Sequence, residues 1–173
     1  MKKYLSTLII CLVLAVFFVV VQLGINNGFI TGYWVTNLYL VGINVILASS
    51  LNLINGFTGE FSLGHAGFMA VGAYSGAIIT ANLGLPFPLA VIVGMLAAGL
   101  TGVLVGLPTL RLRGDYLAIA TLGFGEIVRV VLMNIDYVGG ASGLRDIPFV
   151  VNWPIIFFSV VFSLLLIRNF ICS

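Results

Sequence analysis

Six apolar runs alternate along the chain with short segments rich in glycine, proline and polar residues. The runs cover residues 5–23, 34–54, 66–82, 87–107, 116–137 and 153–167. A transmembrane helix needs about 20 apolar residues, whereas the strands of a membrane β-barrel appear as shorter segments of alternating polarity. The pattern therefore predicts an all-α, polytopic transmembrane helix bundle with about six spans.

The most polar interruption lies between the second and third runs, at residues 55–65. It contains glycines, a threonine, a glutamate, a serine and the only histidine of the chain. Lipid offers the backbone no hydrogen-bond partners, so irregular backbone survives only inside protein, beside a watery cavity or at the interface. We therefore predict a polar, glycine-rich break here and expect function at this break first.

Composition supports a membrane protein and weakens other classes. The chain has 173 residues, of which 61% are hydrophobic and 7% are charged, whereas soluble domains carry about 25% charged residues. A net charge of +2 gives no reason to expect nucleic acid as a partner. Cys11 and Cys172 match neither a disulfide framework nor a zinc pattern, so no metal site is predicted.

The distribution of positive charge predicts the orientation. We interpret residues 5–23 as a retained first span and not as a cleaved signal, because the run is long enough to cross and no small-residue cleavage site follows it. Lysine and arginine favour the cytoplasmic side, and a cytoplasmic N-terminus places there Lys2, Lys3, Arg111, Arg113 and Arg168. Residues 55–65 then join two spans on that side, and whether they dip into the membrane stays open.

Two helix faces carry polar or small residues at regular spacing. At 100° per residue, Asn37, Asn44, Asn52 and Asn55 share one side of the second helix, where they either hydrogen-bond neighbouring helices or line a pathway. In the fourth run a ridge of small residues repeats every four positions, at Gly94, Ala98, Gly102 and Gly106. Such ridges let another helix approach closely, and leucine at Gly102 is expected to stop this packing or the docking of a partner.

The fifth run holds most of the membrane-embedded charge. Asp115, Glu126, Arg129 and Asp136 project within an arc of about 80° of one helix. Glu126 lies about 16 Å along that helix from Asp115, close to mid-membrane, and Arg129 is in reach of it for an ion pair. Intramembrane charges of this kind are paired and functional by default. The alternatives are a self-neutralising pair that locks helices and a pair that serves a pathway.

Two blocks together resemble one transporter family. SLNLINGFTGEFSLGHAGFMAVGAYSGA, at residues 50–77, is similar to the signature of the permease subunits of branched-chain amino acid ABC importers. LRLRGDYLAIATLGFGEIVRVVLMN, followed by GGASGL, resembles the second signature of the M-type permease of that family. The two blocks in this order make the resemblance specific.

The resemblance implies a subunit of an ATP-driven importer for leucine, isoleucine and valine in the bacterial inner membrane. A second, homologous permease subunit would complete the path, cytoplasmic ABC ATPases would drive it, and an extracytoplasmic amino-acid-binding protein would deliver the substrate. No G-x-x-x-x-G-K-[ST] phosphate loop occurs, so a partner chain would use the ATP and no cofactor is expected on this chain. Alternatives are a permease for urea or short amides, and a truncated or scaffold subunit.

Family members also continue through further spans and a loop that docks on the ATPase. We find no counterpart of that loop, and therefore expect residues 1–173 to be one integral membrane permease domain that is incomplete at its C-terminus. An intramembrane enzyme is a poor alternative, since Glu126 and His65 have no nucleophile beside them. No catalytic residue is predicted.

We predict that the break and the charged face of the fifth span line the passage. The start of the third helix, at Gly64, would favour a carboxylate, and Glu126 would meet an ammonium group. His65 is expected to hydrogen-bond at this helix start. The full set of predicted pathway residues is Asn52, Asn55, Gly56, Thr58, Gly59, Glu60, Ser62, Gly64, His65, Gly67, Tyr116, Thr121, Glu126 and Arg129.

Overall fold

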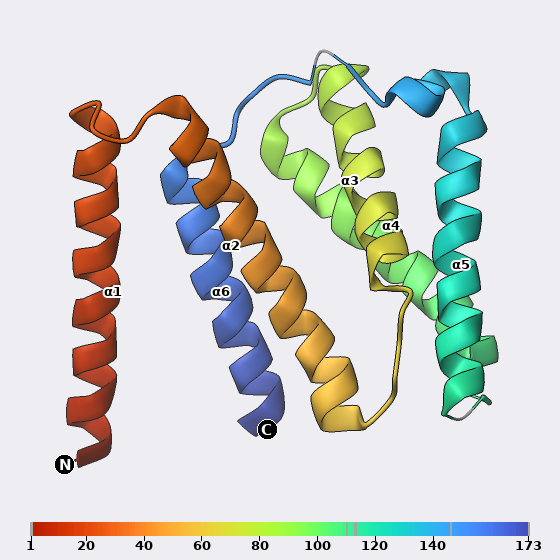
Figure 1. The fold of residues 1–173 in the computed structure, drawn as a ribbon, viewed down its shortest axis with the longest axis horizontal. Coiled ribbons are helices and arrows are strands. Elements are labelled where there is room, and N and C mark those ends of the chain that lie inside the picture. The colour runs from red at the N-terminus through yellow and green to blue at the C-terminus, as the bar shows by residue number, and fades with distance from the viewer. Residues whose placement is uncertain (1, 110, 113, 146, 173) are drawn as a thin grey trace. The chain divides into compact units, whose positions relative to one another are not determined.

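A computed structural model describes the backbone of residues 2–109, 111–112, 114–145 and 147–172, and the side chains of those ranges from residue 12 to residue 171. The described residues form helices and no strand, which confirms the all-α prediction. The elements shown in Figure 1 are α1 (Lys2–Asn26), α2 (Gly32–Asn52), a π-helical turn η1 (Leu53–Thr58), α3 (His65–Ala81), α4 (Phe87–Thr109), α5 (Asp115–Asn134), the 3₁₀ turns η2 (Asp136–Val138) and η3 (Gly140–Ser142), and α6 (Trp153–Cys172).

Four of these helical segments are long and apolar enough to cross a membrane. Within the described residues they are Gly32–Thr58, Phe87–Thr109, Asp115–Asn134 and Trp153–Ile171. The third predicted span corresponds to α3, which has only 17 residues. The part of α1 whose side chains are described, Leu12–Asn26, is a shorter apolar helix. The side chains of Lys2 and Lys3 and the whole of Arg113, which entered the orientation argument, lie outside the described residues.

Two predicted boundaries need correction. The second helix continues four residues past its expected end at residue 54, through η1 to Thr58, so the first part of the polar segment is helical. At the other boundary, α5 ends at Asn134, and Asp136 lies in the separate turn η2. Asp136 therefore does not share the α5 face with Asp115, Glu126 and Arg129. The cause is the extended conformation of Ile135, with ψ of 108°, which ends the helix before Asp136.

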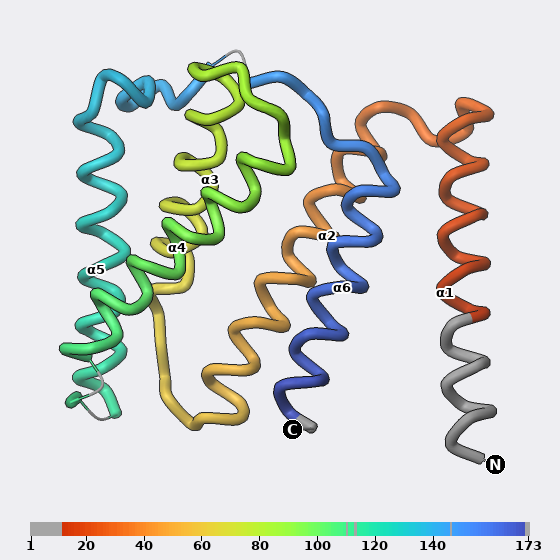
Figure 2. The backbone as a smooth tube through the Cα atoms, turned by 180° about the vertical axis from the view of Figure 1, so that it is seen from behind, coloured from red at the N-terminus to blue at the C-terminus, as the bar shows by residue number. Residues whose placement is uncertain are grey.

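The chain divides into two compact units that are best followed along the tube in Figure 2. The first comprises residues 1–50 and 151–173, with α1, most of α2, and α6. Here aromatic rings join α1 to α6, with Phe18 lying 5.0 Å from Phe157 between ring centroids. Gly42 lets α2 approach α6, since a Cβ atom there would lie 2.5 Å from Cγ2 of Ile156.

The second unit, residues 51–150, contains η1, α3, α4, α5, η2 and η3. In this unit α3 and α4 approach through small residues. A Cβ atom on Gly94 would lie 2.7 Å from the carbonyl oxygen of Gly72, and one on Gly76 would lie 3.2 Å from that of Ala90. The predicted small-residue ridge is thus confirmed in its first half. At Gly102, by contrast, a Cβ atom would have no described atom within 4 Å, so no helix of this chain approaches closely there. The effect of leucine at Gly102 on the docking of a partner stays a prediction.

Alanine at Gly94 is expected to destabilise the protein, whereas alanine at Gly102 is not. The added methyl group meets backbone at Gly94, and such overpacking costs about 1–3 kcal/mol. At Gly102 the methyl group enters open space, and the better helix propensity of alanine contributes up to about 1 kcal/mol in its favour. Thermal unfolding of the two variants in the same detergent, followed by circular dichroism, measures the difference. Equal unfolding midpoints would contradict the α3–α4 contact.

Candidate functional site

The predicted break forms from local hydrogen bonds and one glycine. The backbone N–H of Ser62 donates to Oδ1 of Asn55 over 3.3 Å, and the hydroxyl of Thr58 donates to the carbonyl of Ile54. Gly59 then adopts a left-handed conformation, with φ of 71°, at the end of η1. Glycine reaches this conformation at little cost. These contacts end the helix, and the chain changes direction there. Residues 59–64 follow without helical structure.

Residues 59–64, here called the returning segment, belong to the second unit and lie against α5. The backbone N–H of Leu63 donates to Oγ1 of Thr121 over 3.0 Å. Thr121 is only 5% exposed, and its hydroxyl in turn donates to the carbonyl of Leu117 over 3.0 Å. Next to it, a Cβ atom on Gly64 would lie 2.6 Å from the carbonyl oxygen of Thr121. Only glycine therefore allows this approach of the two backbones.

Helix α3 consequently begins partway along α5. Thr121 is six residues after Asp115, which is about 9 Å along a helix of about 30 Å. In Figure 1 the yellow segment after α2 runs back beside α5, and α3 starts well above the lower end of α5. If α5 crosses the membrane, the start of α3 lies within it. Residues 59–64 thus run along α5 and do not stay at the end of the helices.

A groove of about 310 Å³ lies between α3 and α5. Glycines bring the two helices together beside it, since a Cβ atom on Gly67 would lie 3.1 Å from Cα of Gly125. The rings of Phe68 and Phe124 pack nearby with centroids 5.0 Å apart. The residues lining the groove are Ala66, Gly67, Ala70, Tyr74, Gly125, Glu126, Arg129, Leu132 and Met133.

The charged residues of the groove pair with each other. Nη1 of Arg129 lies 3.4 Å from Oε2 of Glu126, which confirms the predicted ion pair. Their side chains are 64% and 59% exposed. The pair lies within one helix, so it does not by itself lock α5 to a neighbour.

The structure groups the predicted pathway residues in two places. Those of the break lie in η1, in residues 59–64 or at the end of α2. Those of the α3–α5 contact line the groove or lie at the start of α3 and on the part of α5 that faces it. Tyr116 joins neither group, since it lies near the start of α5 and is 74% exposed. Residues of the break are Asn52, Asn55, Gly56, Thr58, Gly59, Glu60 and Ser62, and those of the contact are Gly64, His65, Gly67, Thr121, Glu126 and Arg129.

Sequence reasoning missed the apolar and aromatic walls of the groove. Ala66, Ala70 and Tyr74 recur every four residues on α3, and Leu132 and Met133 follow Arg129 by three and four residues on α5. This spacing indicates a shared helix face, but it does not show which helix the face meets. Of the predicted asparagine face, Asn44 donates to the carbonyl of Leu40 in its own helix.

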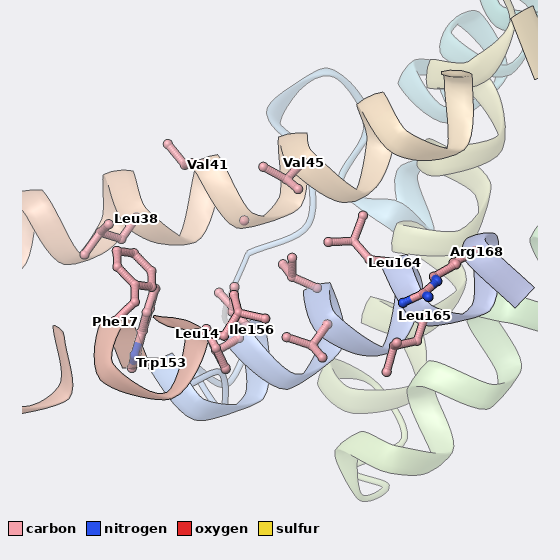
Figure 3. Close-up of a pocket in the computed structure, with 14 residues that line it drawn as sticks. Leu14, Phe17, Leu38, Val41, Val45, Trp153, Ile156, Leu164, Leu165 and Arg168 are labelled. Atoms are coloured by element: carbon pink, nitrogen blue, oxygen red, sulfur yellow. The ribbon is translucent and has the colours of Figure 1, made fainter. Parts of the chain in front are cut away.

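A second cavity, in the first unit, is almost entirely apolar. It has a volume of about 470 Å³ and lies among α1, α2 and α6. Figure 3 shows Arg168 at one end and Phe17 with Trp153 at the other. Arg168 is the only charged side chain among its lining residues. The α3–α5 groove carries both an acidic and a basic side chain, so it is the better candidate site for a polar ligand.

Valine at Thr121 is expected to weaken the attachment of the returning segment. Valine keeps the shape but removes the oxygen that accepts from Leu63, and an unpaired buried N–H costs about 1–3 kcal/mol. Thr121→Ser keeps the oxygen and serves as the control. Thermal unfolding of both variants, together with protease sensitivity of residues 59–64, measures the effect. Equal behaviour of the two variants would contradict the hydrogen bond.

Comparisons with known proteins agree on one family. The family described as "Branched-chain amino acid transport system / permease component" matches residues 33–172. The high-affinity branched-chain amino acid transport system permease protein LivM of Escherichia coli K12 is 47% identical over 110 residues, which are 63% of this chain and 26% of that protein. LivM of Salmonella typhimurium LT2 is 47% identical over 107 residues, which are 61% of this chain and 25% of that protein. The matched region thus spans about a quarter of these relatives. No solved structure matches the chain significantly.

Proposed function

The chain belongs to the branched-chain amino acid transport permease family, and we propose that it acts as a membrane-spanning permease subunit of an ATP-driven importer for leucine, isoleucine and valine. The observation that carries this proposal is the family match over residues 33–172. It confirms the family that the two signature blocks resemble. The spanning helices and the broken α2–α3 connection suit a membrane passage.

The break and the α3–α5 contact form the part of the passage that this chain supplies. In many transporters, substrates bind where a membrane helix is interrupted, because helix starts favour anionic groups and irregular backbone offers free polar groups. Residues 59–64 and the start of α3 have this arrangement, and the N-cap residue of α3, Gly64, supplies no side-chain cap. The proposed lining therefore contains the break residues, Gly64, His65 and Thr121, with Glu126 and Arg129 further along α5.

The partners follow from the same proposal. A second, homologous permease completes the passage, cytoplasmic ATPases supply the energy, and an extracytoplasmic binding protein delivers the amino acid. ATP is bound by the partner ATPases, and this chain carries no cofactor. Residues 1–173 act as a single integral membrane domain, with the N-terminus in the cytoplasm of a bacterial cell.

Uptake by a reconstituted transporter tests the proposal. The protein is assembled in proteoliposomes with the second permease and the ATPases, and binding protein is added with leucine. We expect ATP-dependent accumulation of ¹⁴C-leucine that unlabelled isoleucine and valine inhibit. A vesicle with an ATPase inactivated in its phosphate-binding loop is the control. Uptake of ¹⁴C-urea or acetamide in place of leucine, or no uptake of either, would overturn it.

A further inference from the structure

We propose that the α3–α5 groove is a binding station for an aliphatic α-amino acid, in which Arg129 binds the carboxylate and Glu126 binds the ammonium group. This inference rests on the proposed function and adds the residues that recognise the substrate. It assigns the carboxylate to a side chain of α5 and not to the start of α3 alone. It also assigns the aliphatic side chain of the substrate to the walls of the groove.

The charges of the groove match those of the substrate in sign and spacing. An α-amino acid carries its ammonium and carboxylate groups on the same carbon atom, and the two charged groups of the pair lie 3.4 Å apart. A zwitterion that enters beside the pair gives each side chain a new partner of opposite charge. Arginine is especially suited to a carboxylate, because its planar guanidinium group donates two parallel hydrogen bonds.

Exchange of partners keeps both charges paired. Both side chains are more than half exposed within this chain, so a ligand in the groove can reach them. Exchange of this partner for a substrate replaces one contact between opposite charges with two. At the same time Glu126 and Arg129 lie about midway along α5, where an unpaired charge would be expensive if the helix spans the membrane. Without substrate the groove thus keeps its charges paired with each other, and with substrate it pairs them with the amino acid.

The remaining walls suit a small, aliphatic side chain. Ala66 and Ala70 on α3 and Leu132 and Met133 on α5 line the groove beside the charged pair. Apolar walls with a few placed polar groups are typical of small-ligand sites, whose volumes begin at about 300 Å³, and this groove has about 310 Å³. The contact of Gly67 with Gly125 brings the helices close enough for both walls to touch one ligand.

Exchange of the two charges tests the assignment of polarity. The double variant Glu126→Arg with Arg129→Glu keeps an ion pair on the same helix face but reverses its direction. In the reconstituted transporter we expect kcat/KM for leucine to fall about tenfold or more, since one charge-assisted contact is typically worth at least that factor. A purely structural pair predicts wild-type uptake in the exchanged variant, and that result would overturn the proposal.

A second variant tests the aliphatic wall. It also distinguishes failure of the binding station from failure of the proposed importer function. Ala70→Leu fills the groove and is expected to lower kcat/KM for leucine about tenfold more than for the smaller substrate valine. Ala73→Leu makes the same change on an exposed position of α3 that does not line the groove, and should leave the ratio unchanged. An unchanged ratio in Ala70→Leu, with normal wild-type leucine uptake, overturns the binding station alone. Absence of wild-type leucine uptake overturns the proposed function instead.

Discussion

Alanine in place of Gly64 is expected to abolish leucine uptake and to lower the stability of the second unit by about 2–4 kcal/mol. The new Cβ atom would lie 2.6 Å from the carbonyl oxygen of Thr121. Backbone cannot yield as a flexible side chain does, so the start of α3 must move away from α5. That movement also stretches the hydrogen bond from Leu63 to Thr121, which measures 3.0 Å.

A graded series of glycine variants measures this effect. Gly67→Ala meets its nearest atoms at 3.1 Å and should have a smaller effect, whereas Gly123→Ala, on α5, meets no described atom within 4 Å. We expect uptake and unfolding midpoint to follow the order Gly123→Ala, Gly67→Ala, Gly64→Ala, from mildest to most severe. Wild-type uptake in Gly64→Ala would contradict the close contact of the returning segment with α5.

Alanine in place of Gly139 is expected to destabilise the protein at least as much as alanine in place of Gly64. Gly139 has φ of +85°, and a Cβ atom there would lie 2.1 Å from the carbonyl oxygen of Gly143. A left-handed conformation alone costs a non-glycine residue about 1–2 kcal/mol, and the backbone clash adds to this cost. The loop of η2 and η3 would have to open, and Val138, which is buried, would lose its packing. We expect a loss of more than about 3 kcal/mol in stability.

Gly84→Ala separates the two contributions at Gly139. Gly84 lies in the same unit and has φ of +62°, but no described atom lies within 4 Å of its Cβ position. The variant bears the cost of the conformation and not that of a clash. Chemical or thermal unfolding of the two variants in the same detergent should show a clearly larger loss for Gly139→Ala. Losses of equal size would contradict the packing of the loop upon itself.

Much of the fold follows from local sequence. The apolar runs predict six helices at nearly the observed positions, because run length and glycine or proline boundaries are local properties. The ion pair of Glu126 and Arg129 follows from their spacing on one helix. The end of the fifth helix was predicted wrongly, because the apolar run continues past it. The extended conformation of Ile135 ends α5 and removes Asp136 from the α5 face.

The course of residues 59–64 does not follow from local sequence. It depends on a hydrogen bond between Leu63 and Thr121, which are 58 residues apart, and on the match of Gly64 to one carbonyl group of α5. Glycine-rich composition permits such a contact but does not choose its partner. The groove could not be predicted from local sequence either, because Ala70 and Leu132 come to line it only through the packing of α3 against α5.

Solvent and substrate access at Ser62 tests most directly whether the returning segment lines the passage. In a permease with Cys11 and Cys172 replaced by serine, Ser62→Cys is labelled with a membrane-impermeant thiol reagent in the assembled transporter. Ser159→Cys, on the apolar helix α6, is the control. We predict that Ser62→Cys reacts, that Ser159→Cys does not, and that leucine-loaded binding protein with ATP slows the reaction at Ser62→Cys. Labelling at Ser62→Cys as slow as that at Ser159→Cys, or unchanged by substrate, would contradict the account.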